Sequence, residues 1–253
     1  GRPEARGGAR SHRQLEGHTE WVARRRQGAG PREYELLVLS DHGQVDCRLF
    51  NSGHGENLGA YLARWLPGYR VTEHRGGTFG PVEGPIAGNI AIAYSGGLGH
   101  IYFTDLPGRL NRTDLEPRFP GLVQRLANLD RIGFVMIKDG HAGGIVHPHG
   151  AHRLNEEAAA FLAHLDEPAT ITRQLQRLNS FERSGDIVVF GNFEDNRQVN
   201  LENQVGGHGS AGGDQLHPFV LAKREWALQT AGIEFADQLY RPLAGLVARL
   251  AGG

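Results

Sequence analysis

Hydrophobic and polar positions along the chain predict an alternation of short strands and amphipathic helices. Apolar residues at helical spacing predict four helices, which span residues 56–66, 120–129, 156–165 and 235–250. Short continuous or alternating apolar runs predict strands at residues 35–39, 88–94, 100–103, 133–137 and 186–190.

Two of these strands are expected to form a hairpin, because residues 88–94 and 100–103 flank the turn sequence Ser95-Gly96-Gly97. The run Glu35-Leu-Leu-Val-Leu39 resembles a strand buried in a parallel sheet, and it stops at Ser40-Asp41-His42-Gly43. Mixed strands and helices without a repeat or a long linker predict the α/β class. We expect one domain over residues 34–253, preceded by an irregular or helical segment, 1–33, rich in Arg, Gly and His.

Composition narrows the function classes. The 27 basic and 28 acidic residues give a net charge of −1, so bulk electrostatics does not favour binding to a nucleic-acid polymer or an anionic membrane. No apolar run approaches the ~18 residues of a transmembrane helix, so we expect no membrane segment in this chain. The single cysteine excludes an internal disulfide, whereas 13 histidines make metal chemistry worth testing.

The first candidate for chemistry is the tetrapeptide Ser40-Asp41-His42-Gly43. Ligands collect beyond the carboxyl ends of strands in α/β sheets, and a carboxylate and an imidazole are both good zinc ligands. The alternative is an ordinary turn in which Asp41 caps the following segment.

The second candidate is the glycine-rich loop around His208, which runs from Glu202 to Gly213 and is followed by Gln215-Leu-His217. A histidine among many glycines is typical of a backbone that passes close to a metal or an anion. The alternative is a flexible loop with a solvated histidine.

The third candidate is the histidine cluster His141, His147, His149 and His152. His147-Pro-His149 is a possible ligand pair, but the surrounding proline and glycines favour a solvent-facing hairpin or loop. We therefore expect this cluster to lie outside the site formed by the first two candidates.

The first two candidates together carry a family resemblance. Val38-Leu-Ser-Asp-His-Gly-Gln44 resembles the metal-binding Asp-His-Gly step of the alkaline phosphatase superfamily, and Gly206–Gln215 resembles its final metal-ligand histidine loop. More narrowly, the chain resembles the C-terminal half of bacterial type I phosphodiesterase/nucleotide pyrophosphatase-like proteins. The further matching stretches are residues 88–103, 132–137 and 185–190, and their order and spacing match over roughly 34–221.

The resemblance implies an alkaline phosphatase-like mixed sheet flanked by helices. It also implies a site with two divalent metal ions, usually zinc, whose ligands here include Asp41, His42 and His208. The substrate would be a phosphate ester, either a small molecule or a nucleotide, attacked by a metal-activated Ser or Thr to give a phospho-enzyme.

The chain departs from the family pattern before residue 41. The nucleophile, an aspartate beside it and an Asp-x-x-x-His pair precede the Asp-His-Gly step in the family, whereas Asp41 is the first aspartate here and no Asp-x-x-x-His occurs. Because the chain opens with Gly1 and its only methionine is Met136, we expect a fragment that lacks the N-terminal half of the fold, with an incomplete ligand set and no activity of its own.

The partner that this reading implies is the missing half of the same protein, which would decide whether the whole is extracytoplasmic or membrane-tethered. A non-catalytic metal- or partner-binding module remains open as an alternative, as do a sulfatase or a phosphomutase within the superfamily.

Overall fold

The computed structural model describes residue 20, residues 35–52, 55–73, 78–79, 88–140, 142–204 and 206–251. The expected boundary between residues 33 and 34 lies outside the described residues, as does all of the N-terminal segment except Glu20. The chain divides into two compact units. The larger comprises Asp41–Phe219 with Gly232–Leu239, and the smaller comprises Gly1–Ser40, Val220–Ala231 and Tyr240–Gly253.

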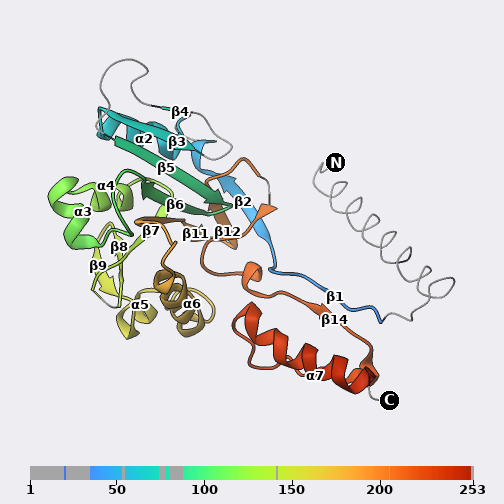
Figure 1. Cartoon of the computed structure of the whole chain (residues 1–253). Coiled ribbons are helices and arrows are strands. Elements are labelled where there is room, and N and C mark those ends of the chain that lie inside the picture. The colour runs from blue at the N-terminus through green and yellow to red at the C-terminus, as the bar shows by residue number, and fades with distance from the viewer. Residues whose placement is uncertain are drawn as a thin grey trace, which may run out of the picture. The chain divides into compact units, whose positions relative to one another are not determined.

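The larger unit is built on an eight-stranded mixed sheet with the strand order β4-β3-β5-β6-β10-β7-β8-β9 (Figure 1). The pair β3–β5 is parallel, whereas the other neighbouring pairs are antiparallel. The strands are β3 (Tyr69–Glu73), β4 (Thr78–Phe79), β5 (Gly88–Ser95), β6 (Leu98–Phe103), β7 (Ile132–Ile137), β8 (Gly144–His147), β9 (Gly150–Arg153) and β10 (Ile187–Gly191).

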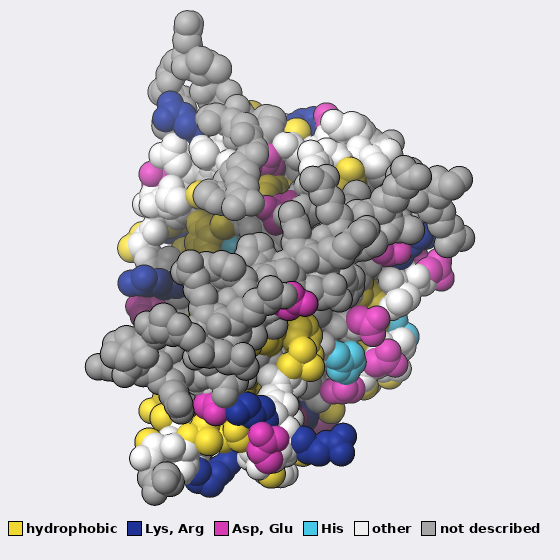
Figure 2. Space-filling view, turned by 90° about the vertical axis from the view of Figure 1, so that its right-hand side faces the viewer, with side chains coloured by type: hydrophobic (Ala, Val, Ile, Leu, Met, Phe, Trp, Pro, Cys, Tyr) yellow, Lys and Arg dark blue, Asp and Glu magenta, His cyan; other side chains and the backbone are white. Residues whose placement is uncertain are grey.

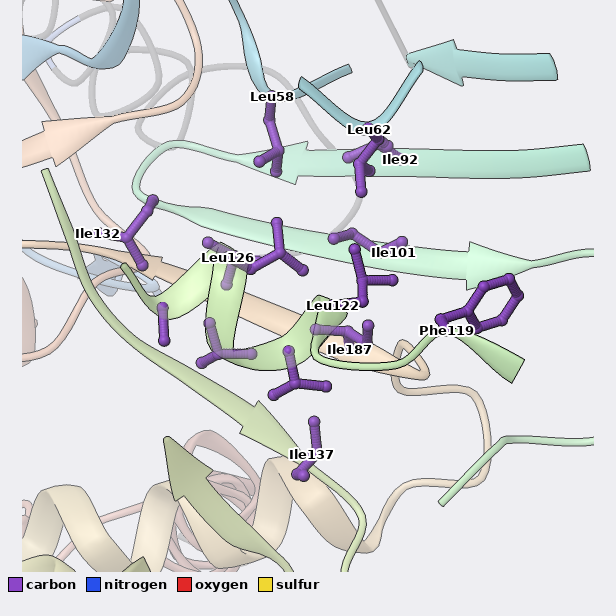
Figure 3. Close-up of a cluster of buried hydrophobic side chains, with 14 of the residues drawn as sticks. Leu58, Leu62, Ile92, Ile101, Phe119, Leu122, Leu126, Ile132, Ile137 and Ile187 are labelled. Atoms are coloured by element: carbon purple, nitrogen blue, oxygen red, sulfur yellow. The ribbon is translucent and has the colours of Figure 1, made fainter. Parts of the chain in front are cut away.

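Helices cover both faces of this sheet, so its central strands are buried on both sides. In β10, Ile187 and Val189 join one core cluster while Val188 and Phe190 join the other, as the two-residue period of a strand requires. Figure 3 shows the first core, where Leu58 and Leu62 of α2 (Leu58–Trp65) and Leu122 and Leu126 of α4 (Leu122–Ala127) meet the sheet. Leu115 of α3 (Arg112–Arg118) belongs to the same core. The second core contains residues of α5 (Glu156–Phe161) and α6 (Pro168–Ser180).

A separate four-stranded sheet, with the order β11-β12-β2-β13, belongs to the same unit. Its strands are β2 (Val45–Leu49), β11 (Phe193–Glu194), β12 (Arg197–Asn200) and β13 (Gly206–Gly207). Two 3-10 turns, η1 (Phe50–Ser52) and η2 (Asp214–Leu216), lie close to it in sequence, and a third, η4 (Ala236–Leu239), occupies the last segment of the unit.

The smaller unit contains the antiparallel pair β1 (Val38–Leu39) and β14 (Val220–Leu221), the 3-10 turn η3 (Arg224–Trp226) and helix α7 (Tyr240–Ala251). The prediction that residues 35–39 form a buried parallel strand is wrong. Only Val38–Leu39 are extended, and their partner is antiparallel. A two-stranded ribbon leaves side chains open to solvent, and Leu39 is 47% exposed.

The other predicted strands and helices are present, and with them the α/β class and a mixed sheet flanked by helices are confirmed. The expected hairpin is β5–β6, and the last predicted helix is η4 followed by α7. Helix α6 was not predicted, although Pro168 at its start and Ile171, Leu175 and Leu178 at helical spacing are its sequence signals.

On the face shown in Figure 2, several acidic side chains of the described residues gather on the right-hand side around a histidine, whereas basic and acidic side chains alternate along the lower edge. None of the helices in the described part of the chain has the length and apolar character needed to span a membrane.

Candidate metal centre

The antiparallel pairing of β13 with β2 brings the two principal candidate motifs together. Gly207 pairs with Val45, so His208, which follows β13, lies beside the residues that precede β2. There the rings of His42 and His208 stack with their centroids 3.6 Å apart and their planes inclined by 23°. The structure thus joins the Asp-His-Gly step to the glycine-rich loop, which are far apart in sequence.

Local hydrogen bonds orient Asp41 and His42. The Nδ1 atom of His42 lies 2.7 Å from the carbonyl oxygen of Gly43, and because a carbonyl can only accept, Nδ1 carries the proton. In the neutral ring the lone pair of His42 is then on Nε2, which lies 3.6 Å from Oδ1 of Asp41. A histidine whose second ring nitrogen donates to a carbonyl is the usual arrangement of a metal ligand.

His208 is held through its backbone. Its carbonyl oxygen accepts from the backbone N–H of Gly97, in the β5–β6 turn, at 2.8 Å and from Nε2 of Gln198 at 2.9 Å. Burial and the neighbouring His42 lower the pKa of His208, against the opposing influence of Asp41 and Glu202. This favours the neutral ring, which is the form that binds metals.

Glycines allow the segments of the site to approach this closely. A Cβ on Gly96, which has φ +58°, would lie 2.1 Å from the carbonyl oxygen of His208, and one on Gly43 would lie 1.9 Å from the carbonyl oxygen of Asp214. The backbone N–H of Gly43 also donates to the carbonyl of Gln215 at 3.1 Å. Gly43 of the first motif and Gly96 of the β5–β6 turn therefore serve backbone packing around the histidines.

Three buried amide side chains lie behind the site. Gln198, Asn200 and Gln215 are each at most 5% exposed, and each has one side-chain atom without a hydrogen-bond partner among the described residues: Oε1, Nδ2 and Oε1 respectively. Buried polar atoms without partners commonly mark a water or an ion.

Gln198 and Asn200 were not among the residues predicted from the sequence, and Glu202 and Gln215 were named only as part of the second candidate segment, without a role of their own. One Glu202 carboxylate oxygen accepts from the backbone N–H of Gly96 at 2.7 Å. The polar pattern Gln198-Val-Asn200 within a strand is the sequence signal for the first two of these amides.

The third candidate, the histidine cluster, lies on the β8–β9 hairpin, as expected. Its rings are not all solvent-facing, since His147 is only 9% exposed and its Nε2 lies 3.1 Å from Nε2 of His152. Burial, His152 and His149 lower the pKa of His147. His141 lies outside the described residues.

The number of ligands is smaller than that of a complete site. Within the described part of the chain, no group of three or more His, Cys, Asp or Glu side chains is placed to hold one metal ion. Asp41, His42 and His208 therefore fit zinc in donor type, whereas a shared four-ligand shell does not form from them.

Comparison of the chain with protein-family models, with curated proteins and with solved structures gives no match. The resemblance to the alkaline phosphatase superfamily consequently depends on the motif series and on the geometry of Asp41, His42 and His208.

Proposed function

We propose that this chain carries metal ligands of a phosphoric ester hydrolase of the alkaline phosphatase type, related to phosphodiesterases and nucleotide pyrophosphatases. The observation that supports it is the stacking of His42 on His208, with Asp41 beside them. The resemblance requires these three residues to lie together in the fold. Their local sequence gives no other reason to expect this. The α/β class with a mixed sheet flanked by helices agrees with the proposed fold at the level of its layers.

In this proposal the three ligand residues bind two separate ions. Asp41 and His42 would bind one ion through Oδ1 and Nε2, and His208 would bind the other. The two rings stack with their centroids 3.6 Å apart, and an imidazole binds a metal through a nitrogen in its own ring plane, so each ring would bind a different ion. Water or substrate oxygens would complete both shells, because protein ligands are few.

When bound, the two ions would supply positive charge to the attacking and leaving oxygens of a phosphate ester. The chain's own residues position the donors. The carbonyl of Gly43 fixes the tautomer of His42, while Gly97 and Gln198 fix the backbone of His208. We assign no nucleophile.

Zinc and phosphate binding by the purified chain test this proposal. We expect isothermal titration calorimetry to detect zinc binding that weakens at least about tenfold in His208→Gln, equivalent to ~1.4 kcal/mol. His217→Gln is the matched control, because His217 is exposed and belongs to the neighbouring sequence without being a proposed ligand. Inorganic phosphate should bind the zinc-loaded protein and not the zinc-free protein.

Each alternative gives a different result. Zinc binding that depends on His208 without any affinity for phosphate would indicate a non-catalytic metal-binding module. Preference for sulfate over phosphate would favour a sulfatase. Zinc binding that is the same in wild type and His208→Gln would contradict the site itself.

A further inference from the structure

The β8–β9 hairpin offers a second constellation of histidines, separate from Asp41, His42 and His208. β9 is the edge strand of the eight-stranded sheet, and helix α5 packs against it (Figure 1). His147 ends β8, and His152, in β9, is half-buried. An edge position gives a small ion a direct path from solvent to the pair.

The two imidazoles face each other through their Nε2 atoms. These atoms are 3.1 Å apart, and the ring planes are inclined by only 6° with centroids 5.1 Å apart. Two nitrogens that each lie ~2.0–2.1 Å from one metal ion are separated by about 2.9–3.4 Å for ligand angles near 90–110°. The observed separation falls within that window.

The rings are held in place by aromatic packing. The ring of Phe161, at the end of α5, stacks on His147 at a centroid distance of 4.3 Å and lies 5.5 Å from His152. Contact with the ring of Phe161 restricts the side-chain rotamers of both imidazoles. Less conformational entropy would therefore be lost when the pair binds an ion.

We propose that His147 and His152 bind one late first-row divalent metal ion, such as Cu²⁺ or Zn²⁺, through their Nε2 atoms. Imidazole suits these ions, and water would occupy the remaining coordination positions. This site is independent of the proposed function.

Ion binding requires a change of tautomer at His147. Its Nδ1 accepts the backbone N–H of His149 at 3.3 Å, so its proton is on Nε2 and points toward His152. An ion displaces that proton to Nδ1, which gives up the long bond to His149. The exposed turn leaves this N–H free to bond to water, and the pair releases no net proton.

Electron paramagnetic resonance of the Cu²⁺-loaded protein tests the site. The measurement uses the His208→Gln background, so that the Asp41–His208 site is weakened. We expect hyperfine coupling to two equivalent imidazole nitrogens. His152→Gln in the same background should remove it and weaken Cu²⁺ binding at least tenfold, whereas His217→Gln should change neither.

Substitution of His152, on the edge strand, is chosen because His147 is buried and its loss could disturb folding. An identical copper spectrum with and without His152 would overturn the proposal, and so would the absence of two-nitrogen coupling in the background protein. Zinc and phosphate binding of His152→Gln in otherwise wild-type protein would separate this failure from failure of the proposed function.

Discussion

At the scale of single residues, orientation is set by immediate neighbours. His42 donates from Nδ1 to the carbonyl of the next residue, Gly43, so a neighbour in sequence determines that Nε2 is the nitrogen available to a metal. The sequence could therefore suggest Asp41 and His42 as donors from a four-residue pattern. The pattern Gln198-Val-Asn200 could draw attention to two polar residues in a strand, but it could not show that their amides are buried with atoms that lack partners.

The contact of Gly96 with His208 leads to a prediction about the site. Gly96→Ala places a methyl group against the carbonyl of His208 and a side chain at φ +58°. Gly140 is the matched control, since it has the same φ and no described atom lies within 4 Å of its Cβ position. We expect Gly140→Ala to cost ~1–2 kcal/mol of unfolding free energy, Gly96→Ala to cost more, and only Gly96→Ala to weaken zinc binding.

Urea unfolding and zinc calorimetry on both variants measure these effects. Equal loss of stability in the two variants, with zinc affinity unchanged, would show that the β5–β6 turn does not position His208.

At the scale of elements, periodic patterns predicted helices α2, α4, α5 and α7 and the central strands β5, β6, β7 and β10, since burial on one or two faces imposes the period directly. Helices α3 and α6 and, apart from β1, the short or edge strands were not predicted. The failure at residues 35–39 has a physical cause. A continuous apolar run indicates that the side chains are buried, but it does not indicate which strand pairs with the run. Here the partner is the short strand β14. Pairing between distant strands, such as β13 with β2, was likewise beyond local patterns.

His100, on β6, leads to a prediction about pH. Its Nδ1 accepts the backbone N–H of Gly185, next to β10, at 2.9 Å, and burial, with a smaller effect of Arg109, lowers the pKa of His100. The unfolded chain has a pKa near ~6.5. A lowered folded-state pKa means that the stabilisation is present above ~6.5 and is lost as pH falls through the folded-state pKa.

His100→Asn keeps an acceptor near the position of Nδ1 and does not titrate. We expect the unfolding free energy of the wild type to fall relative to this variant between pH 7.5 and pH 5, by at most ~1.4 kcal/mol per pH unit. Urea unfolding across this range measures it, with His217→Asn as the control for loss of an exposed histidine. A constant difference would rule out this role for His100.

At the scale of the whole molecule, the fold class could be predicted from the sequence, whereas the division into two units could not. The α/β class follows from mixed periodicity, whereas the division of residues 220–253 between two compact units has no sequence signal that we recognise. The convergence of Asp41, His42 and His208 could be predicted only through the resemblance, because it depends on the whole sheet topology.

Catalytic activity also depends on the molecule as a whole. We expect the chain alone, with added zinc, to show no turnover of bis(4-nitrophenyl) phosphate above buffer. The three ligand side chains cannot fill the shells of two ions, and a two-ion clamp needs fixed geometry to lower a barrier. Robust zinc-dependent turnover that disappears in His208→Gln would contradict this, and Ser40 would then be examined as a nucleophile.

The stack of His42 on His208 also has a consequence for folding kinetics. Contacts between positions so far apart along the chain close slowly, because loop-closure entropy must be overcome before they form. Two zinc ions held side by side by Asp41, His42 and His208 would therefore require this contact to have formed. At a free zinc concentration one hundred times the dissociation constant, mass action would add ~2.7 kcal/mol to the stability of the larger unit. The pair of ions would thus stabilise the chain only after the contact between His42 and His208 has formed.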